Sequence, residues 1–145
     1  MNTIGENFNI TNYICSTLSA TSAVAGWVDA TDFSQALATY TRTAGTANLT
    51  AFRIDVCDTL SAGVATSDTA TVKSAVLTNN PNAVGDYVPL EVTESEIRAA
   101  ADAAGLVGKY ISGVLIEPDG TGVSVVTLIG RSKRPHLSLT SAYIQ

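Results

Sequence analysis

The residues that could perform chemistry are few and far apart in this chain. Its 145 residues include one histidine, His136, and two cysteines, Cys15 and Cys57. Histidine is the usual general acid or base, because its pKa lies near neutral pH. His136 has no second histidine with which to share a metal, and the cysteines lack metal-ligand spacing. We therefore expect no metal site, no cofactor and no enzymatic activity.

The carboxylates do not change this expectation. Asp55 and Asp58 flank Cys57, and Asp29 lies near Asp32. Carboxylates are common on strand exteriors and at helix caps, so neither pair indicates an acid–base couple. Hydrolysis by carboxylates alone remains the enzymatic alternative. Cys57 ends an alternating strand pattern, which predicts a half-buried structural thiol.

One cluster of basic residues indicates a contact surface. Residues 131–136 (Arg-Ser-Lys-Arg-Pro-His) hold three of the eight Lys and Arg residues. The chain has a net charge of −5, which disfavours general binding to nucleic acid. A protein surface rich in carboxylates is therefore the favoured partner, with Arg131, Lys133, Arg134 and His136 as contact residues. The alternative is a solvated loop that Pro135 turns.

The totals indicate one domain over residues 1–145. The hydrophobic fraction of 46% is enough for a core. Charged residues make up 14%, against about 25% in typical soluble domains. This deficit is typical of a surface covered by partners, although an acidic soluble protein rich in Ser and Thr is the alternative. The apolar stretch 123–129 is far shorter than the ~20 residues that span a bilayer, so no membrane is expected. The sequence begins without a secretory signal pattern, which predicts reduced thiols in a cytoplasmic setting.

Most of the chain has the patterns of β-strands. Over 49–58, Phe52, Ile54 and Val56 alternate with polar residues, as in a half-buried strand. Pro89 marks its strand as an edge strand or an irregular one. Further strands are expected at 7–18, 23–28, 72–78, 87–92, 109–116, 121–129 and 137–144, with 109–116 and 121–129 forming a hairpin.

Two short helices are expected between the strands. The spacing of Phe33, Ala36, Leu37 and Tyr40 predicts a helix that begins at residue 31 or 32. The sequence Thr-Glu-Ser-Glu at 93–96 has the form of a capping box and predicts a helix that ends near residue 105. The expected fold is mainly β (α+β): an antiparallel sandwich or curved sheet of seven to nine strands with two short helices.

As a whole, the chain resembles the structural proteins of tailed bacteriophage virions. Like them it is an acidic β domain rich in Ala, Thr, Val and Gly, with a polar N-terminal segment and no active-site motif. It is most similar to capsid decoration (cement) proteins. The resemblance implies a homo-oligomer, often a trimer, that is made in the host cytoplasm, resides in the virion and binds the major capsid protein or other virion subunits.

The resemblance also implies a mechanical function, in which the protein bridges capsid subunits and stabilises the shell. Residues 1–11 are then a candidate arm that binds a neighbouring subunit, with Asn7 and Phe8 as contact residues. A tail-tube or connector component would share this composition. A small monomeric binding module for carbohydrate or peptide is the alternative from another class.

Overall fold

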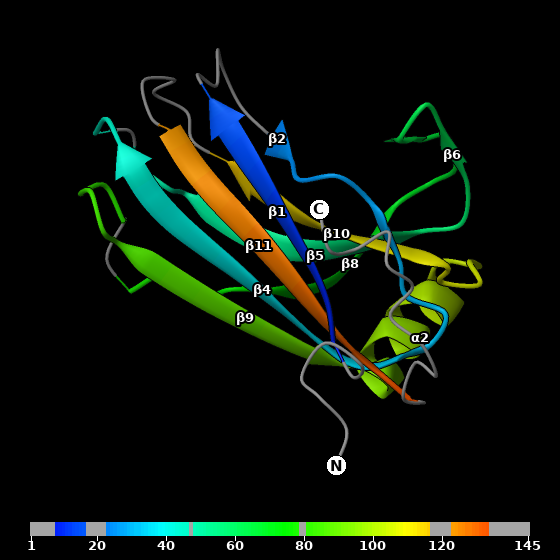
Figure 1. The fold of residues 1–145 in the computed structure, drawn as a ribbon. Helices are drawn as coiled ribbons and strands as arrows, with labels where there is room; N and C mark the ends of the chain where they lie inside the picture. The colour runs from blue at the N-terminus through cyan, green and yellow to red at the C-terminus, as the bar shows by residue number, and fades with distance from the viewer. Residues whose placement is uncertain (1–7, 17–22, 47, 79–80, 117–122, 134–145) are drawn as a thin grey trace, which may run out of the picture.

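The protein is described by a computed structural model, shown in Figure 1. The structure describes residues 8–16, 23–46, 48–78, 81–116 and 123–133. Within these residues the chain forms strands and one helix in the order β1 (Phe8–Ser16), β2 (Ala23–Val24), β3 (Val28–Asp29), β4 (Phe33–Ala44), β5 (Ala51–Cys57), β6 (Leu60–Ser61), β7 (Val64–Ala65), β8 (Ala70–Ser74), β9 (Tyr87–Thr93), α2 (Glu94–Ala103), β10 (Tyr110–Ile116) and β11 (Val123–Ser132).

The strands form two antiparallel sheets and one small hairpin. The first sheet has the order β1-β11-β4-β9, which places the longest strands in its centre. The second has the order β2-β10-β5-β8, and β3 pairs with the same strand as β2. Among the described strands, β6 and β7 pair only with each other. The expectation of a mainly β, antiparallel chain is confirmed.

The two sheets face each other across one hydrophobic core (Figure 1). The ring centroids of Tyr40 on β4 and Phe52 on β5 lie 6.1 Å apart, so the two rings meet between the sheets. Buried residues of both sheets belong to the same cluster: Phe33, Ala36, Ala38, Tyr40, Leu90, Val92, Val126 and Leu128 from the first, and Phe52, Ile54, Val56, Ile111 and Leu115 from the second.

The helix α2 begins where the sequence places it. The Thr93 hydroxyl accepts from the Glu96 amide at 3.4 Å, and the Glu96 carboxylate accepts from the Thr93 amide at 2.7 Å. This reciprocal capping satisfies two amides that would otherwise lack partners at the helix start. Ile97 and Ala101 are buried and attach the helix to the core.

The helix expected from residue 31 to residue 40 is wrong. Residues 33–44 form β4, which is paired on both sides by β11 and β9. Ala36, Ala38 and Tyr40 are buried and alternate as in any strand. A shift in the register near Phe33 puts Phe33 and Ala36 on the same buried side, three residues apart. This β-bulge produced the helix-like spacing.

Other expectations need correction as well. Residues 110–116 and 123–132 do not form a hairpin, because β10 and β11 belong to different sheets. The strand expected at 72–78 lies at 70–74 instead. The strands expected near 7–18, 49–58 and 87–92 are confirmed. Among the described strands, β9, which contains Pro89, pairs only with β4 and is therefore an edge strand. The strand expected at 137–144 lies outside the described residues.

Candidate functional site

One end of the first sheet brings together several residues that the sequence singles out. A single row of paired positions crosses its four strands from Phe8 through Arg131 and Gln35 to Thr93. Thr93 is also the residue that caps α2. The start of β1, the end of β11 and the start of the helix therefore lie side by side.

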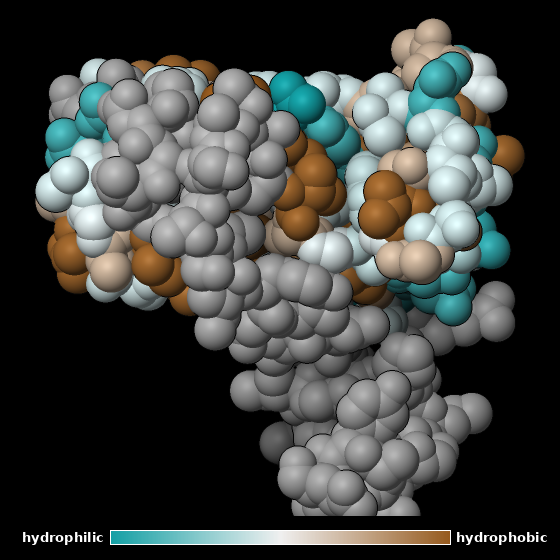
Figure 2. All heavy atoms as spheres, turned by 90° about the horizontal axis from the view of Figure 1, so that it is seen from above, coloured by the Kyte–Doolittle hydropathy of each residue, from teal (hydrophilic) through white to brown (hydrophobic). Residues whose placement is uncertain are grey.

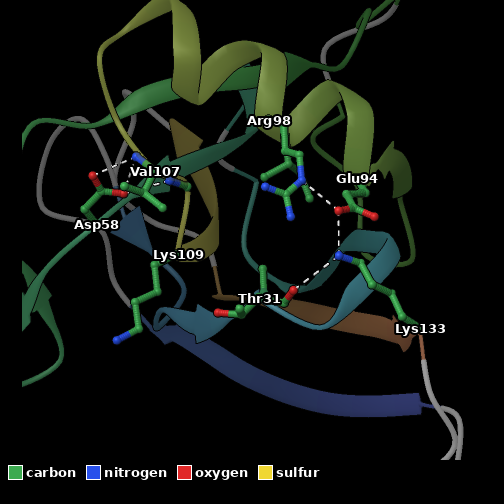
Figure 3. A pocket seen from close by; sticks show the side chains of 10 residues that line it. Thr31, Asp58, Glu94, Arg98, Val107, Lys109 and Lys133 are labelled. Carbon is green, nitrogen blue, oxygen red and sulfur yellow. Dashed lines mark hydrogen bonds and ion pairs between the residues drawn. The ribbon is translucent and has the colours of Figure 1, made fainter.

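The basic residues at this end are already held by neighbours. Arg131 donates from Nη1 to the Gln35 side-chain oxygen at 3.3 Å and is otherwise exposed. Lys133 donates from Nζ to Glu94 Oε1 at 2.5 Å and to the Thr31 carbonyl oxygen at 3.4 Å (Figure 3). The Lys133 amide also donates to the Asp32 carbonyl oxygen at 2.7 Å. The end of β11 is thus fixed against the helix.

Glu94 is the centre of this small network. It accepts from Lys133 and, at 2.7 Å, from Arg98 one helical turn later (Figure 3). These hydrogen bonds, the Lys133 bond first, lower the pKa of the Glu94 carboxyl below its usual value. A carboxylate in the first turn also lies where the helix dipole favours negative charge.

A pocket of about 320 Å³ opens beside this network, and we call it the α2 pocket. Its lining combines an apolar floor with charged side chains: Ala30, Thr31, Asp58, Glu94, Ile97, Arg98, Val107, Gly108, Lys109 and Lys133. Asp58 does not act as a free carboxylate there, because it accepts from the amides of Val107 at 2.9 Å and Gly108 at 2.7 Å (Figure 3). These amides, Val107 first, lower the pKa of Asp58.

The two carboxylates of the α2 pocket, Asp58 and Glu94, are occupied by backbone amides or by cations. Within the described part of the chain, no group of three or more His, Cys, Asp or Glu side chains is placed to hold a metal ion.

The predicted contact residues are only partly placed. Phe8 and Arg131 are paired neighbours, and Lys133 lies against α2. Asn7, Arg134 and His136 lie outside the described residues. Cys57, expected to be half-buried, is fully buried as a free thiol. Burial, and next the charge of Asp58, raises the pKa of this thiol.

Sequence reasoning missed a second pocket, of about 300 Å³, on the outer face of the second sheet. We call it the Trp27 pocket, since the one tryptophan of the chain lines it together with Arg53 and Asp55. Arg53 and Asp55 are two residues apart on β5, so the alternation places both on one face, which the sequence already indicated. The alternation of residues along the strands does not show that Trp27 and the loops that line the pocket lie on that face.

Exposed apolar side chains are scattered over several elements. The largest exposed ones are Val24, Val64, Val76, Val84, Tyr87 and Val107. On the face seen in Figure 2, apolar surface forms separate patches among polar surface. No helix in the described residues is long and apolar enough to cross a membrane.

Comparison with known proteins gives distant likenesses only. No protein-family model and no curated protein matches the chain. The SPBc2 prophage-derived protein YomS has a TM-score of 0.41 and 10% identity, over 86% of this chain and 95% of YomS. A chain of infectious bursal disease virus, Gx strain, has a TM-score of 0.40 and 7% identity, over 89% of this chain and 35% of its own length. A Bacillus endospore appendage, which forms disulfide-linked pili, has a TM-score of 0.33 and 13% identity, over 88% of this chain and 90% of its own. Because these TM-scores are all below 0.5, the fold is assigned from the strand order of the chain itself.

Proposed function

We propose that this chain is a non-enzymatic structural protein of a virion, a capsid decoration (cement) protein that stabilises the shell by bridging its subunits. In this proposal the protein is made in the bacterial host cytoplasm, assembles as a trimer and binds the major capsid protein. Its mechanism is mechanical: it holds neighbouring subunits together and performs no reaction.

The strand order is the observation that carries the proposal. The chain alternates between the sheets so that β1, β11, β4 and β9 form one sheet, and β2 with β3, β10, β5 and β8 form the other. This is the order of a double-sheet jelly roll, the sandwich used by viral capsid domains and also by lectins and cupins. The fold alone does not decide among these functions, so the surface must supply the rest.

The end of the first sheet supplies a second support. Strand β1 begins at Phe8 and β11 ends at Ser132, and Phe8 pairs with Arg131. The segments 1–7 and 134–145 therefore both join the described fold at this end. The proposed arm is expected over residues 1–11, of which residues 8–11 belong to β1; residues 1–7 lie outside the described residues. An arm and a basic contact that engage different subunits act together, and such multivalency raises avidity by roughly 10²–10⁴.

The chemistry of this end fits a carboxylate surface on the partner. Arg131 is exposed, and among the described residues its guanidinium has a hydrogen bond to the neutral Gln35 amide and no ion pair. A guanidinium prefers planar, two-oxygen acceptors such as carboxylates. Since the whole chain carries a charge of −5, a carboxylate-bearing protein is a better partner than a nucleic acid backbone.

Co-sedimentation with shells of the virus that encodes the chain tests the proposal. The wild-type protein is expected to pellet with shells, and Arg131→Gln is expected to pellet less at low salt. The difference between the two proteins should shrink as salt is raised, because salt screens the charge contact that the wild type makes. Lys73→Gln is the matched control, because Lys73 is an exposed cation on the second sheet that pairs with Glu96. Absence of the protein from shells at every ratio would reject the decoration function. Assembly into open rings or tubes would favour the tail-tube or connector alternative.

A further inference from the structure

The Trp27 pocket is lined by residues of strands β2, β5, β7 and β10 and of the loops next to them. Val24 on β2, Val114 on β10 and Arg53 on β5 occupy one row of paired positions across the second sheet. The β6–β7 hairpin adds Gly63, Val64 and Ala65 to the lining. Trp27 is partly exposed and does not belong to the hydrophobic core. The pocket therefore has an apolar wall that includes an indole ring with no role in the core.

The segment that carries Trp27 is anchored directly before the tryptophan. The buried Ser112 hydroxyl donates to the Ala25 carbonyl oxygen at 2.5 Å and also lies 3.2 Å from the Gly26 carbonyl oxygen. The Ala25 amide donates to the Gly113 carbonyl oxygen at 2.8 Å. These bonds fix the backbone on β10 and hold Trp27 beside the pocket before any ligand arrives.

A buried carboxylate fixes the polar side of the pocket. Asp55 has only 4% of its surface exposed. It accepts from Thr71 Oγ1 at 2.9 Å and from Arg53 Nε at 3.0 Å. The Arg53 side chain is 36% exposed, and among the described residues no acceptor meets its two terminal nitrogens. Arg53 is thus oriented through Nε while its outer N–H groups remain available.

This arrangement selects a class of ligand. Two parallel N–H groups match a pair of acceptor oxygens, as in a carboxylate or in neighbouring sugar hydroxyls. The charge of Asp55 cancels that of Arg53 and repels an anion, so the pair favours a neutral ligand. The face of an indole ring packs well against the apolar C–H face of a sugar ring. A volume of about 300 Å³ lies at the lower end of the range for small-molecule sites.

We propose that the Trp27 pocket binds a neutral sugar ring, with the ring stacked on Trp27 and two neighbouring hydroxyls bound by the outer N–H groups of Arg53. Val24, Val64 and Val114 exclude water around the apolar edge of the sugar. This site lies on the second sheet, away from the row of Phe8 and Arg131, and does not depend on the proposed structural function.

Fluorescence gives a direct test, because Trp27 is the one tryptophan of the chain. The full chain is titrated with methyl glucoside, methyl galactoside and N-acetylglucosamine, and with glucuronate as the anionic comparison. We expect a saturable change in Trp27 emission with at least one neutral sugar, with a Kd of about 1 mM. Calorimetry of Trp27→Ala and of the wild type measures the same binding without the fluorophore, and the variant is expected to show none.

Two arginine variants separate binding from a structural effect. Arg53→Gln is expected to weaken sugar binding at least tenfold, because it removes the outer donors. Arg98→Gln is the matched control: Arg98 also uses Nε to bind a carboxylate, that of Glu94, but lies outside the pocket. It should bind sugar like the wild type. No saturable change with any neutral sugar up to about 100 mM, binding of glucuronate alone, or equal losses in both arginine variants would overturn the proposal.

Discussion

The contact between Gly113 and Val126 provides a sharp test of how the sheets pack. Gly113 lies on β10 in the second sheet and Val126 on β11 in the first. A methyl group added at Gly113 would lie 2.8 Å from Val126 Cγ1 and 3.6 Å from Phe52 Cε2. Carbon atoms in contact are normally about 3.5–4.0 Å apart. Gly113→Ala should therefore push the two sheets apart at this point.

The expected free energies follow from the packing. Overfilling a dense core costs about 1–3 kcal/mol, which exceeds the roughly 0.5–1 kcal/mol that alanine gains over glycine inside a strand. Gly113→Ala should thus destabilise the wild-type protein. Val126 is fully buried, and Val126→Ala alone should cost about 2 kcal/mol through lost burial and a cavity.

The double variant gives the decisive comparison. In the Val126→Ala protein the new methyl group at residue 113 has room, so Gly113→Ala should become neutral or stabilising there. Urea unfolding of the four proteins measures the coupling, which we expect to be at least about 1 kcal/mol, with melting temperatures shifting by roughly 2–4 °C for each kcal/mol. Additive effects would contradict the reasoning, because they would mean that residues 113 and 126 do not meet between the sheets.

Further predictions concern acid stability, the thiol and the basic end. Hydrogen bonds from Lys73 first, and then from Thr93, lower the pKa of Glu96 from 4.5 to about 2. A lowered folded-state pKa contributes stability that is complete above the unfolded value and is lost as the pH falls from 4.5 towards 2. The free energy of unfolding of Glu96→Gln should therefore fall less than that of the wild type over this pH window. An equal fall in both proteins would refute the assignment. Cys57 should react with a thiol reagent only after denaturant is added, because the thiol is buried with a raised pKa, and fast labelling of the native protein would be the contrary result. Arg131→Glu should leave the melting temperature within about 2 °C of the wild type, because the residue is exposed and not part of the core, and a large loss of stability would show that Arg131 supports the fold instead of a contact.

The sequence predicts the parts of the fold that depend on local patterns. The alternation of Phe52, Ile54 and Val56 identifies β5, and the capping box identifies α2 at its observed first residue. The sequence fails where distant pairing decides. The bulge near Phe33 gave a central strand a helix-like spacing of apolar residues. The Pro-Asp-Gly sequence between residues 116 and 123 predicts a hairpin, although β10 and β11 belong to different sheets.

The candidate site shows the same division. The composition singled out Arg131 and Lys133, but the Glu94 carboxylate that holds Lys133 is 39 residues away in the chain. The capping of the Val107 amide by Asp58 spans 49 residues. Such contacts follow from strand order, which no local pattern encodes. The sequence can thus identify candidate residues of a site, whereas the residues that contact them are known only from the folded structure.

The solution mass by light scattering tests the central claim most directly. We compare the full chain with a variant lacking residues 1–7, since β1 begins at Phe8 and the deletion leaves the described strands intact. The structural proposal predicts a closed oligomer, with a trimer as the expected mass, and a smaller or weaker assembly after the deletion. A full chain that remains a monomer at every concentration, with the same mass after the deletion, would contradict it.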